Sequence, residues 1–515
     1  MHLARRRIYP RRRIRVVSGL SQLINPGPHQ TLASELRRAA HDSADRPFLR
    51  MRHREWTFKE FDGLTDACAA GFSHLAITLQ ENVSLLLPNC IEFAIAWFGL
   101  TKIGAVAAPV NTSFRGAVLA SAFNLVDSRV LVVHQDLLPA LLEILAELPN
   151  IREVVVVGEA LVELEKSGVR WTRWQDLAED STASYEPREV PFSALTLLLY
   201  TSGTTGRSKA AMISHRYVLE QARLTVQGLK LRQDDVLYCP YPMFHLDSAV
   251  MTIAPALVLR CVAAIGERFS VSKYWDEVRA LGATVFDFMG ATLTMLWKQP
   301  PSPKDRDHRA RLGWGVPMPA WAEAFEERFG CQLVELYGST EVGSMIFNPP
   351  DQPRRVGSCG RPIGPFDVAL LDEDGFEVGP GVPGELVIRP KAPSMIMDGY
   401  YGMPEETLQA FKNLWFHTGD VLKRDVDGYL YFVGRCKDMI RRRGENISAA
   451  EVEMVIEEHP DILECAVYGV PSEMTEEEVM VCAVTREGRS LSPQDLTDYC
   501  AQRMASFMVP RFVRF

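Results

Sequence analysis

A stretch of small polar residues between Tyr200 and His215 is the clearest sign of chemistry in the sequence. It reads YTSGTTGRSKAAMISH and directly follows the apolar run from Ala194 to Leu199. An apolar run that ends in hydroxyls and glycines is typical of a buried strand leading into a loop. Such a loop suits a polyphosphate, because glycines let backbone N–H groups approach, hydroxyls donate hydrogen bonds and Lys209 adds a positive charge. The candidate phosphate-binding residues are Thr201, Ser202, Gly203, Thr204, Thr205, Gly206 and Lys209.

This loop differs from a Walker P-loop. Gly-Lys-Ser/Thr is absent, and Lys209 stands three residues after Gly206. A flexible Ser/Thr/Gly linker is the alternative interpretation. Linkers rarely follow a core strand or carry a lysine in this position, so the pattern favours a phosphate loop.

Three further segments place a polar or charged side chain beside a predicted strand. His245 lies in YPMFHLDS, Glu341 in ELYGSTE and Asp420 in WFHTGD. Taken alone, each has an ordinary structural explanation: a packed histidine, a turn followed by a helix cap, and a turn aspartate. A carboxylate at the end of a strand, as predicted for Asp420, can also accept hydrogen bonds from both hydroxyls of a ribose.

The elements that must position these residues follow a strand, helix, strand pattern. Asn82 to Pro88 is a predicted buried strand, and Ile91 to Ile103 is a predicted helix that Gly104 ends before the strand from Ala105 to Val110. This order implies parallel pairing through a right-handed crossover. Further strands are predicted near 129–133, 154–157, 195–200, 284–288 and 332–335, and another begins at 236. A helix is predicted at 320–329, and one or two helices are predicted around a hairpin at 47–58.

The C-terminal part of the chain has a different pattern. A Gly/Pro-rich, strand-rich region from Val356 to Tyr401 predicts a small β subdomain. Beyond it, helices at 449–458 and 492–504 and strands at 462–468 and 478–484 predict a compact α+β unit.

Composition narrows the class of protein. The chain has 515 residues, 47% of them apolar, which is enough for a large core and more than one domain. A net charge of −9 does not favour general binding to nucleic acid or membrane surfaces. The ten cysteines form no Cys-x-x-Cys pair, which predicts reduced thiols, a cytosolic enzyme and no zinc site. The first fifteen residues hold seven arginines, for which a disordered extension is preferred over a transit peptide.

Three long segments together resemble the adenylate-forming superfamily. They are the Tyr200 to His215 loop, LLLPNCIEFAIAWFGLTKIGAVAAPVN (85–111) and YFVGRCKDMIRRRGENISAAEVE (431–453). The resemblance spans roughly residues 30 to 515 and is strongest to the acyl-CoA synthetase branch that includes crotonobetaine/carnitine-CoA ligases. The chain departs from the family pattern at Ser208, usually a proline, and at Arg443, usually a glycine.

The resemblance implies an α/β fold with a mobile lid. Residues 26–434 form a large AMP-binding N-terminal domain of stacked α/β subdomains plus a β-rich subdomain, after a basic extension at 1–25. Residues 435–437 form a hinge, and residues 438–515 form a small α+β C-terminal lid. This lid is expected to be incomplete. In the family, the phrase MVPRFVRF (508–515) is followed by a Gly-Lys segment, and no residue of the given sequence matches that segment.

The resemblance also assigns roles to residues. Thr204, Lys209, His245 and Glu341 are the expected catalytic residues, with His245 facing the acid and Glu341 holding Mg²⁺. The remaining residues are assigned to nucleotide or coenzyme A: Tyr337 against adenine, Gly338 beside it, Thr340 on the α-phosphate, Asp420 and Arg435 on the ribose, Lys437 at the hinge, and Gly444, Glu445 and Asn446 along the pantetheine tunnel.

The implied reaction is AMP-forming ligation of a carboxylic acid to coenzyme A, with ATP, Mg²⁺ and coenzyme A as cosubstrates or cofactors. The expected partners are these small molecules and neither nucleic acid nor membrane, and the oligomeric state is left open, a homodimer included. Two alternatives remain: an adenylation enzyme that loads a separate carrier protein, and a nucleotide-binding protein defective in adenylation. The acid itself is not predicted.

Overall fold

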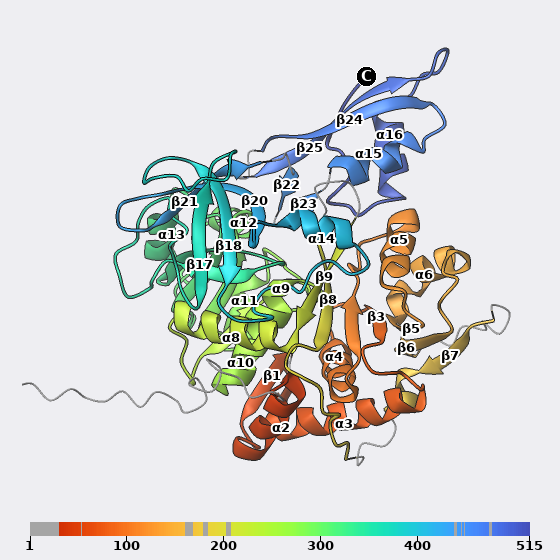
Figure 1. The fold of residues 1–515 in the computed structure, drawn as a ribbon, viewed down its shortest axis with the longest axis vertical. Helices are drawn as coiled ribbons and strands as arrows, with labels where there is room; N and C mark the ends of the chain where they lie inside the picture. Colours follow the sequence, from red (N-terminus) through yellow and green to blue (C-terminus); the bar gives the residue numbers. More distant parts are fainter. Residues whose placement is uncertain are drawn as a thin grey trace, which may run out of the picture.

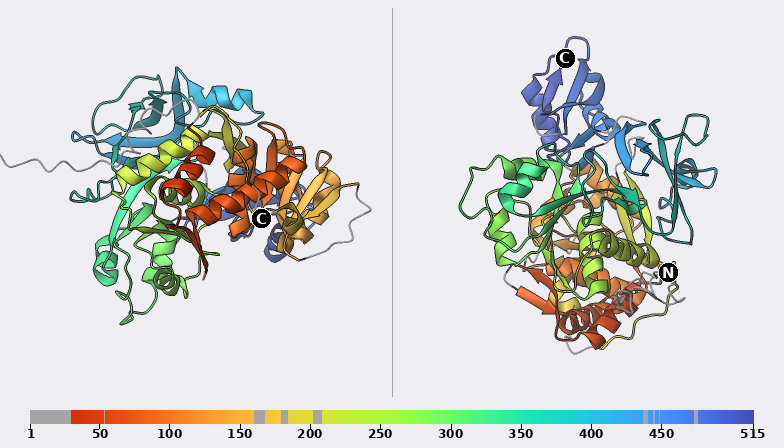
Figure 2. Two further views of the ribbon diagram at one scale, coloured as in Figure 1. Left: turned by 90° about the horizontal axis from the view of Figure 1, so that it is seen from below. Right: turned by 90° about the vertical axis from the view of Figure 1, so that its left-hand side faces the viewer.

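The computed structural model describes residues 30–52, 54–159, 168–178, 184–201, 208–436, 440–443, 445–447, 449–472 and 476–515. These ranges form a large body, with a smaller C-terminal part against one end of it (Figure 1). Figure 2 shows this small part standing clear of the body in a second direction. The α/β fold with a large N-terminal and a small C-terminal part is therefore confirmed.

The first sheet of the body has seven strands in the order β7-β6-β5-β3-β4-β8-β9. Its pairs are parallel except for β8 with β9, and helix α4 (Ile91–Ile103) connects the parallel neighbours β3 and β4. Gly104 ends α4 in the left-handed region, at φ 72°. The parallel strand, helix, strand order predicted from the sequence is thus confirmed. The strands are β3 Asn82–Leu86, β4 Val106–Pro109, β5 Val130–His134, β6 Glu153–Val157, β7 Arg170–Arg173, β8 Leu195–Thr201 and β9 Lys209–Ser214.

The second sheet has nine strands in the order β16-β15-β14-β13-β12-β10-β11-β1-β2. The run from β14 to β1 is parallel, so the carboxyl ends of β14, β13, β12 and β10 meet at one edge. The strands are β1 Pro47–Met51, β2 Arg54–Thr57, β10 Val236–Cys239, β11 Val262–Ile265, β12 Val285–Met289, β13 Leu312–Val316, β14 Gln332–Ser339, β15 Gly343–Phe347 and β16 Arg361–Pro362.

Strand β14 is longer than predicted. The expected strand ended at Glu335, with a turn at Tyr337 and Gly338. In the structure β14 continues to Ser339, because β15 pairs antiparallel with its second half. That pairing brings a Cβ placed on Gly338 to 2.5 Å from the Ser344 Oγ, so only glycine fits there.

The two sheets share one apolar core. It draws buried residues from both sheets, such as Leu85 of β3 and Leu237 of β10, and from helices packed on them. Helices α2 and α3 lie across the end of the body opposite the C-terminal part (Figures 1 and 2). The helices of the body are α2 Leu32–Asp42, α3 Phe58–His74, α4, α5 Gly116–Val126, α6 Leu138–Ile144, α7 Trp174–Leu177, α8 His215–Gly228, α9 Leu246–Ser248, α10 Ala254–Leu259, α11 Tyr274–Ala280, α12 Gly290–Trp297, α13 Ala322–Phe329 and α14 Pro404–Ala410, with a π-helical turn, η3, at Ala249–Ile253.

A separate sheet forms the β-rich region. It contains β17 Phe366–Leu371, β18 Gly384–Pro390, β19 Phe411–Lys412, β20 Trp415–Arg424 and β21 Leu430–Arg435. The predicted β subdomain is confirmed, but it extends beyond the predicted end at Tyr401, because β19, β20 and β21 belong to the same sheet. Asp420, however, lies inside the ten-residue β20 and not at a strand end, because β20 pairs with β18 on one side and β21 on the other.

The C-terminal part agrees with the predicted α+β unit and adds strands to it. It comprises β22 Ile440–Arg442, β23 Glu445–Ile447, α15 Ala449–Glu457, β24 Ile462–Pro471, β25 Glu477–Thr485, α16 Pro493–Ala501 and β26 Phe512–Arg514. Ser492 caps α16, accepting a hydrogen bond from the Asp495 backbone N–H, so the predicted helix start was one residue early and its end, at Met504, three residues late. The short pairs β22–β23 and β25–β26 were not predicted.

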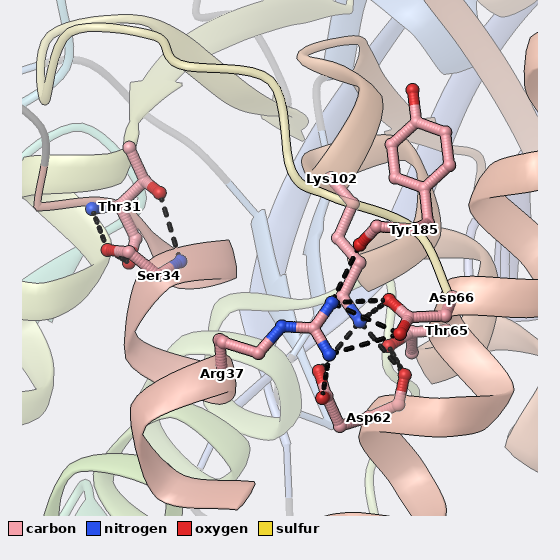
Figure 3. Close-up of polar contacts among 8 residues, drawn as sticks. All are labelled: Thr31, Ser34, Arg37, Asp62, Thr65, Asp66, Lys102 and Tyr185. Atoms are coloured by element: carbon pink, nitrogen blue, oxygen red, sulfur yellow. Dashed lines mark hydrogen bonds and ion pairs between the residues drawn. The ribbon is translucent and has the colours of Figure 1, made fainter. Parts of the chain in front are cut away.

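A buried charge cluster joins three helices of the body (Figure 3). The Lys102 ammonium of α4 is fully buried and lies 2.7 Å from Asp62 Oδ1 and 2.5 Å from Asp66 Oδ1, both on α3. Arg37 of α2 pairs with the same two carboxylates and donates to the Tyr185 carbonyl at 2.7 Å. Two cations thus neutralise two carboxylates, and the cluster ties α2, α3 and α4 to the segment at 184–190.

We expect Lys102→Met to lower the free energy of unfolding by about 3–5 kcal/mol, because it leaves two buried carboxylates with a single cation. Urea denaturation followed by tryptophan fluorescence measures the change. Lys59→Met, at an exposed position on α3, is the matched control and should change stability by no more than about 0.5 kcal/mol. Equal midpoints for the two variants would contradict a structural role for the cluster.

Candidate active site

The two ends of the candidate phosphate loop lie side by side. Thr201 at the end of β8 pairs in register with Lys209 at the start of β9. The predicted residues Ser202, Gly203, Thr204, Thr205 and Gly206 lie outside the described residues. Antiparallel pairing of β8 with β9 therefore brings Lys209 back to the end of the buried strand, as expected for a loop that returns on itself.

Lys209 and Glu341, the predicted metal ligand, both contact the side chain of Tyr400. The Lys209 ammonium lies 4.7 Å from the centre of the Tyr400 ring. The Tyr400 hydroxyl donates to Glu341 Oε1 at 3.0 Å, and burial raises the pKa of Tyr400. Lys209 and Glu341, 132 positions apart in the sequence, therefore lie on either side of one tyrosine.

A second cluster gathers the residues predicted to bind the nucleoside. The Tyr337 hydroxyl of β14 donates to Asp420 Oδ2 at 2.6 Å. Asp420 stands opposite Arg435 in the β20–β21 pair, with Arg435 Nε 3.1 Å from Asp420 Oδ1. Burial raises the pKa of Asp420 in spite of this cation and the tyrosine hydrogen bond. Oδ1 lacks a well-aligned hydrogen bond, so it is available to a ligand donor.

Thr340 and Glu341 follow β14 directly. The Thr340 carbonyl accepts a hydrogen bond from the buried Tyr217 hydroxyl at 2.9 Å, which fixes the backbone at this point. Glu335, earlier on β14, accepts from the Met318 N–H at 3.1 Å, and burial raises its pKa to about 7. The segment that was predicted as a turn is thus the end of strand β14. Glu335 lies within the strand and accepts from a backbone N–H, whereas Glu341 follows the strand and accepts from the Tyr400 hydroxyl.

His245 faces the C-terminal part of the chain. Its Nε2 lies 3.3 Å from Oε1 of Glu445 in β23. Burial alone lowers the pKa of His245, but the Glu445 carboxylate outweighs it and the net pKa is raised. The contact brings the predicted Gly-Glu-Asn motif to the carboxyl end of β10, although Gly444 and the hinge residue Lys437 lie outside the described residues. Asn446 lies in β23.

Three residues that support the site were not predicted. Asn89 donates to the carbonyls of Tyr241 and Gly266 and accepts from the Met243 N–H, so it holds the loop that carries His245. Tyr400 and Glu451 are the others, and Glu451 accepts from Ser208 Oγ at 2.7 Å. No spacing rule reveals these contacts, because each joins segments more than 50 positions apart.

Comparison with known proteins agrees with this geometry. The model of the AMP-binding enzyme family matches residues 36–401, and the model of the AMP-binding enzyme C-terminal domain matches residues 451–515. The chain belongs to the AMP-binding enzyme family. Crotonobetaine/carnitine–CoA ligase from Salmonella typhi is 32% identical over 467 residues, which cover 89% of each protein.

Two solved structures extend the comparison. A fatty acyl CoA synthetase from Mycobacterium tuberculosis is 28% identical, with a TM-score of 0.68 and 94% of each chain covered. The amide bond synthetase McbA from Marinactinospora thermotolerans is 22% identical, with a TM-score of 0.83, and covers 94% of this chain and 95% of its own. The second likeness is one of fold, and it shows that the fold also serves an enzyme of a different kind.

No helix in the described ranges has both the length and the apolar character needed to span a membrane.

We expect Tyr337→Phe to destabilise the body by about 1–3 kcal/mol, since it leaves the buried Asp420 Oδ2 without its donor. Thermal and urea unfolding measure this loss. Tyr401→Phe is the control, because no hydrogen bond of its hydroxyl is found in the described structure, and it should leave stability within about 0.5 kcal/mol. A loss no greater than that of the control would contradict the importance of the Tyr337–Asp420 bond.

Proposed function

We propose that the protein is an AMP-forming ligase that joins a carboxylic acid to coenzyme A. It is an acyl-CoA synthetase-type enzyme of the AMP-binding family. The observation that carries the proposal is the contact between His245 and Glu445, whose side chains lie 3.3 Å apart. In the same structure Tyr337 and Arg435 both contact Asp420. At this edge of the large sheet, His245 thus marks the place proposed for the acid, and Tyr337 with Asp420 marks the place proposed for the nucleoside. The C-terminal part covers the acid side through Glu445.

In the first step, an acid oxygen attacks the α-phosphorus of ATP and pyrophosphate leaves. Carboxylates are poor acyl donors, and the resulting acyl-AMP has a far better leaving group. The chain contributes positioning and charge rather than a covalent nucleophile. Lys209 and the loop that follows Thr201 neutralise the phosphates, Thr340 binds the α-phosphate, Tyr337 and Gly338 border the adenine, and Asp420 with Arg435 holds the ribose.

Glu341 is the proposed Mg²⁺ ligand. Mg²⁺ is usually held by one or two carboxylates plus phosphate oxygens, and a single carboxylate hydrogen-bonded to Tyr400 beside Lys209 fits that requirement. Among the described residues no group of three or more His, Cys, Asp or Glu side chains could hold a metal without a substrate. When bound with ATP, Mg²⁺ would neutralise phosphate charge.

In the second step, the coenzyme A thiol attacks the acyl carbon of acyl-AMP and AMP leaves. We propose that Gly444, Glu445 and Asn446 border the path of the thiol and that Glu445 orients His245 beside the acyl group.

We also propose the division of the chain into residues 26–434 and 438–515 with a hinge at 435–437. A cytoplasmic location is supported by ten cysteines that are all free.

The direct test is mass spectrometry after incubation with MgATP, coenzyme A and a pooled panel of carboxylic acids. Acyl-CoA and AMP should appear together in equal amounts. Acyl-AMP formed at the same rate with and without coenzyme A, and never converted to a thioester, would favour the carrier-loading alternative. ADP in place of AMP would contradict the proposal outright.

We expect Glu445→Gln to slow the coenzyme A-dependent step by about tenfold, because it removes a charge-assisted contact with His245. ATP–pyrophosphate exchange, which reports the first step, should change by less than about twofold. Glu464→Gln, an exposed position on β24, is the control for the loss of one carboxylate from the C-terminal part. Equal losses in both half-reactions would contradict the assignment of Glu445 to the thioester step.

A further inference from the structure

Ser208 links the phosphate loop to the C-terminal part of the chain. It stands at the described end of the loop, one residue before Lys209, which begins β9. Its Oγ donates a hydrogen bond to Oε1 of Glu451 at 2.7 Å. Glu451 lies 243 positions away, in the first turn of α15. A carboxylate of the C-terminal part therefore lies against the loop that is proposed to bind the phosphates of ATP.

Glu451 occupies the donors that a phosphate loop offers to its ligand. Its side chain is buried at this contact, with 6% of the residue's surface exposed. Burial raises the pKa of Glu451 and outweighs the hydrogen bonds from the hydroxyl and the backbone N–H of Ser208, which lower it. Hydroxyls and backbone N–H groups are also the donors that bind phosphate oxygens. The Glu451 carboxylate thus stands where one end of a polyphosphate can accept the same hydrogen bonds.

Both donors depend on the serine at position 208. Proline, the residue that the adenylate-forming superfamily usually has here, carries neither a hydroxyl nor a backbone N–H. A proline could therefore not donate to Glu451 in either way. The departure from the family pattern at Ser208 thus has a structural consequence, which is a polar contact between the loop and α15.

Apolar packing holds Glu451 in this place. Val452, the next residue of α15, belongs to a buried cluster that includes Val118 and Leu119 of α5. Tyr200 of β8 packs against the same cluster. The helix that carries Glu451 is thus docked beside the strand that leads into the phosphate loop, and the contact with the loop belongs to this docked arrangement.

We propose that the described end of the phosphate loop is a shared anion site, which pyrophosphate and the Glu451 carboxylate occupy in turn. This inference rests on the proposed ligase function and concerns the order of its steps. While Glu451 accepts from Ser208, a pyrophosphate oxygen cannot accept from the same donors, and the two negative groups repel each other. Docking of α15 therefore follows the departure of pyrophosphate and opposes its return.

The return of pyrophosphate matters because it reverses the first step. A pyrophosphate oxygen would attack the α-phosphorus of acyl-AMP, the bond from that phosphorus to the acyl oxygen would break, and ATP and the free carboxylate would re-form. A carboxylate placed on the loop during the thioester step hinders this reversal. Glu451 is thus a positioning residue that protects the intermediate and takes no part in the chemistry itself.

The first test is calorimetric titration of magnesium pyrophosphate into the full chain. Glu451→Gln keeps the size of the side chain and removes its charge, so we expect it to bind pyrophosphate about tenfold more tightly than the wild type. Glu457→Gln, at an exposed position of the same helix, is the matched control and should bind as the wild type does. Equal affinities for the wild type and Glu451→Gln would overturn the proposal.

Ser208→Ala tests the competition in two backgrounds. In the wild-type background it removes a donor from both competing anions, so the affinity for pyrophosphate should change by less than about twofold. In the Glu451→Gln background pyrophosphate alone depends on that donor, and the affinity should fall about fivefold. Effects of equal size in the two backgrounds would show that Glu451 does not compete for Ser208.

The wild-type chain gives a further readout that needs no variant. Pyrophosphate that displaces Glu451 should increase amide hydrogen exchange in α15 (Ala449–Glu457), as measured by mass spectrometry. Unchanged exchange in α15 at saturating pyrophosphate would overturn the shared site.

Inhibition by pyrophosphate separates this inference from the ligase proposal. With an acid that yields a thioester, the concentration of pyrophosphate that halves acyl-CoA formation should be about tenfold lower for Glu451→Gln than for the wild type. If no acid gives a thioester but Glu451→Gln binds pyrophosphate more tightly, the ligase proposal fails and the shared site stands. If a thioester forms and the two proteins bind pyrophosphate equally, the ligase stands and the shared site fails.

Discussion

Burying a charge costs several kcal/mol unless an opposite charge lies beside it, and this constraint shapes both the scaffold and the site. In the scaffold, Lys102 is fully buried because Asp62 and Asp66 lie against it. In the site, Asp420 remains inside β20 because Arg435 and the Tyr337 hydroxyl meet it. In both places an opposite charge beside the buried group offsets the cost.

The same constraint links the two parts of the chain. Glu445 of the C-terminal part meets His245 of the body, and the pairing favours a protonated imidazole in spite of burial. Ser208 and Glu451 form a second polar link between the two parts. The two parts also share apolar contacts, because one buried cluster includes Val118 and Leu119 of α5 and Val452 and Val455 of α15.

Local patterns in the sequence predicted most of the architecture. The run from Asn82 to Val110 was predicted as strand, helix and strand because buried parallel strands and glycine-ended helices have strong local signals. The second half of β14 and the short strand β26 were missed, since each exists only through pairing with a distant partner. In the site, resemblance to the family indicated His245, Asp420 and Arg435, and the structure places each in a polar cluster; their roles remain proposals. Asn89, Tyr400 and Glu451 could not be singled out, because their meaning depends on neighbours brought together by folding.

The most direct test of the account is the fate of oxygen in the acid. Attack of the carboxylate on the α-phosphorus of ATP leaves one acid oxygen on AMP after the thiol displaces it. We therefore predict that an acid labelled with ¹⁸O in its carboxylate will transfer one labelled oxygen to AMP for each acyl-CoA formed, as measured by mass spectrometry. AMP that contains no label, or label found in phosphate, would contradict the acyl-adenylate route.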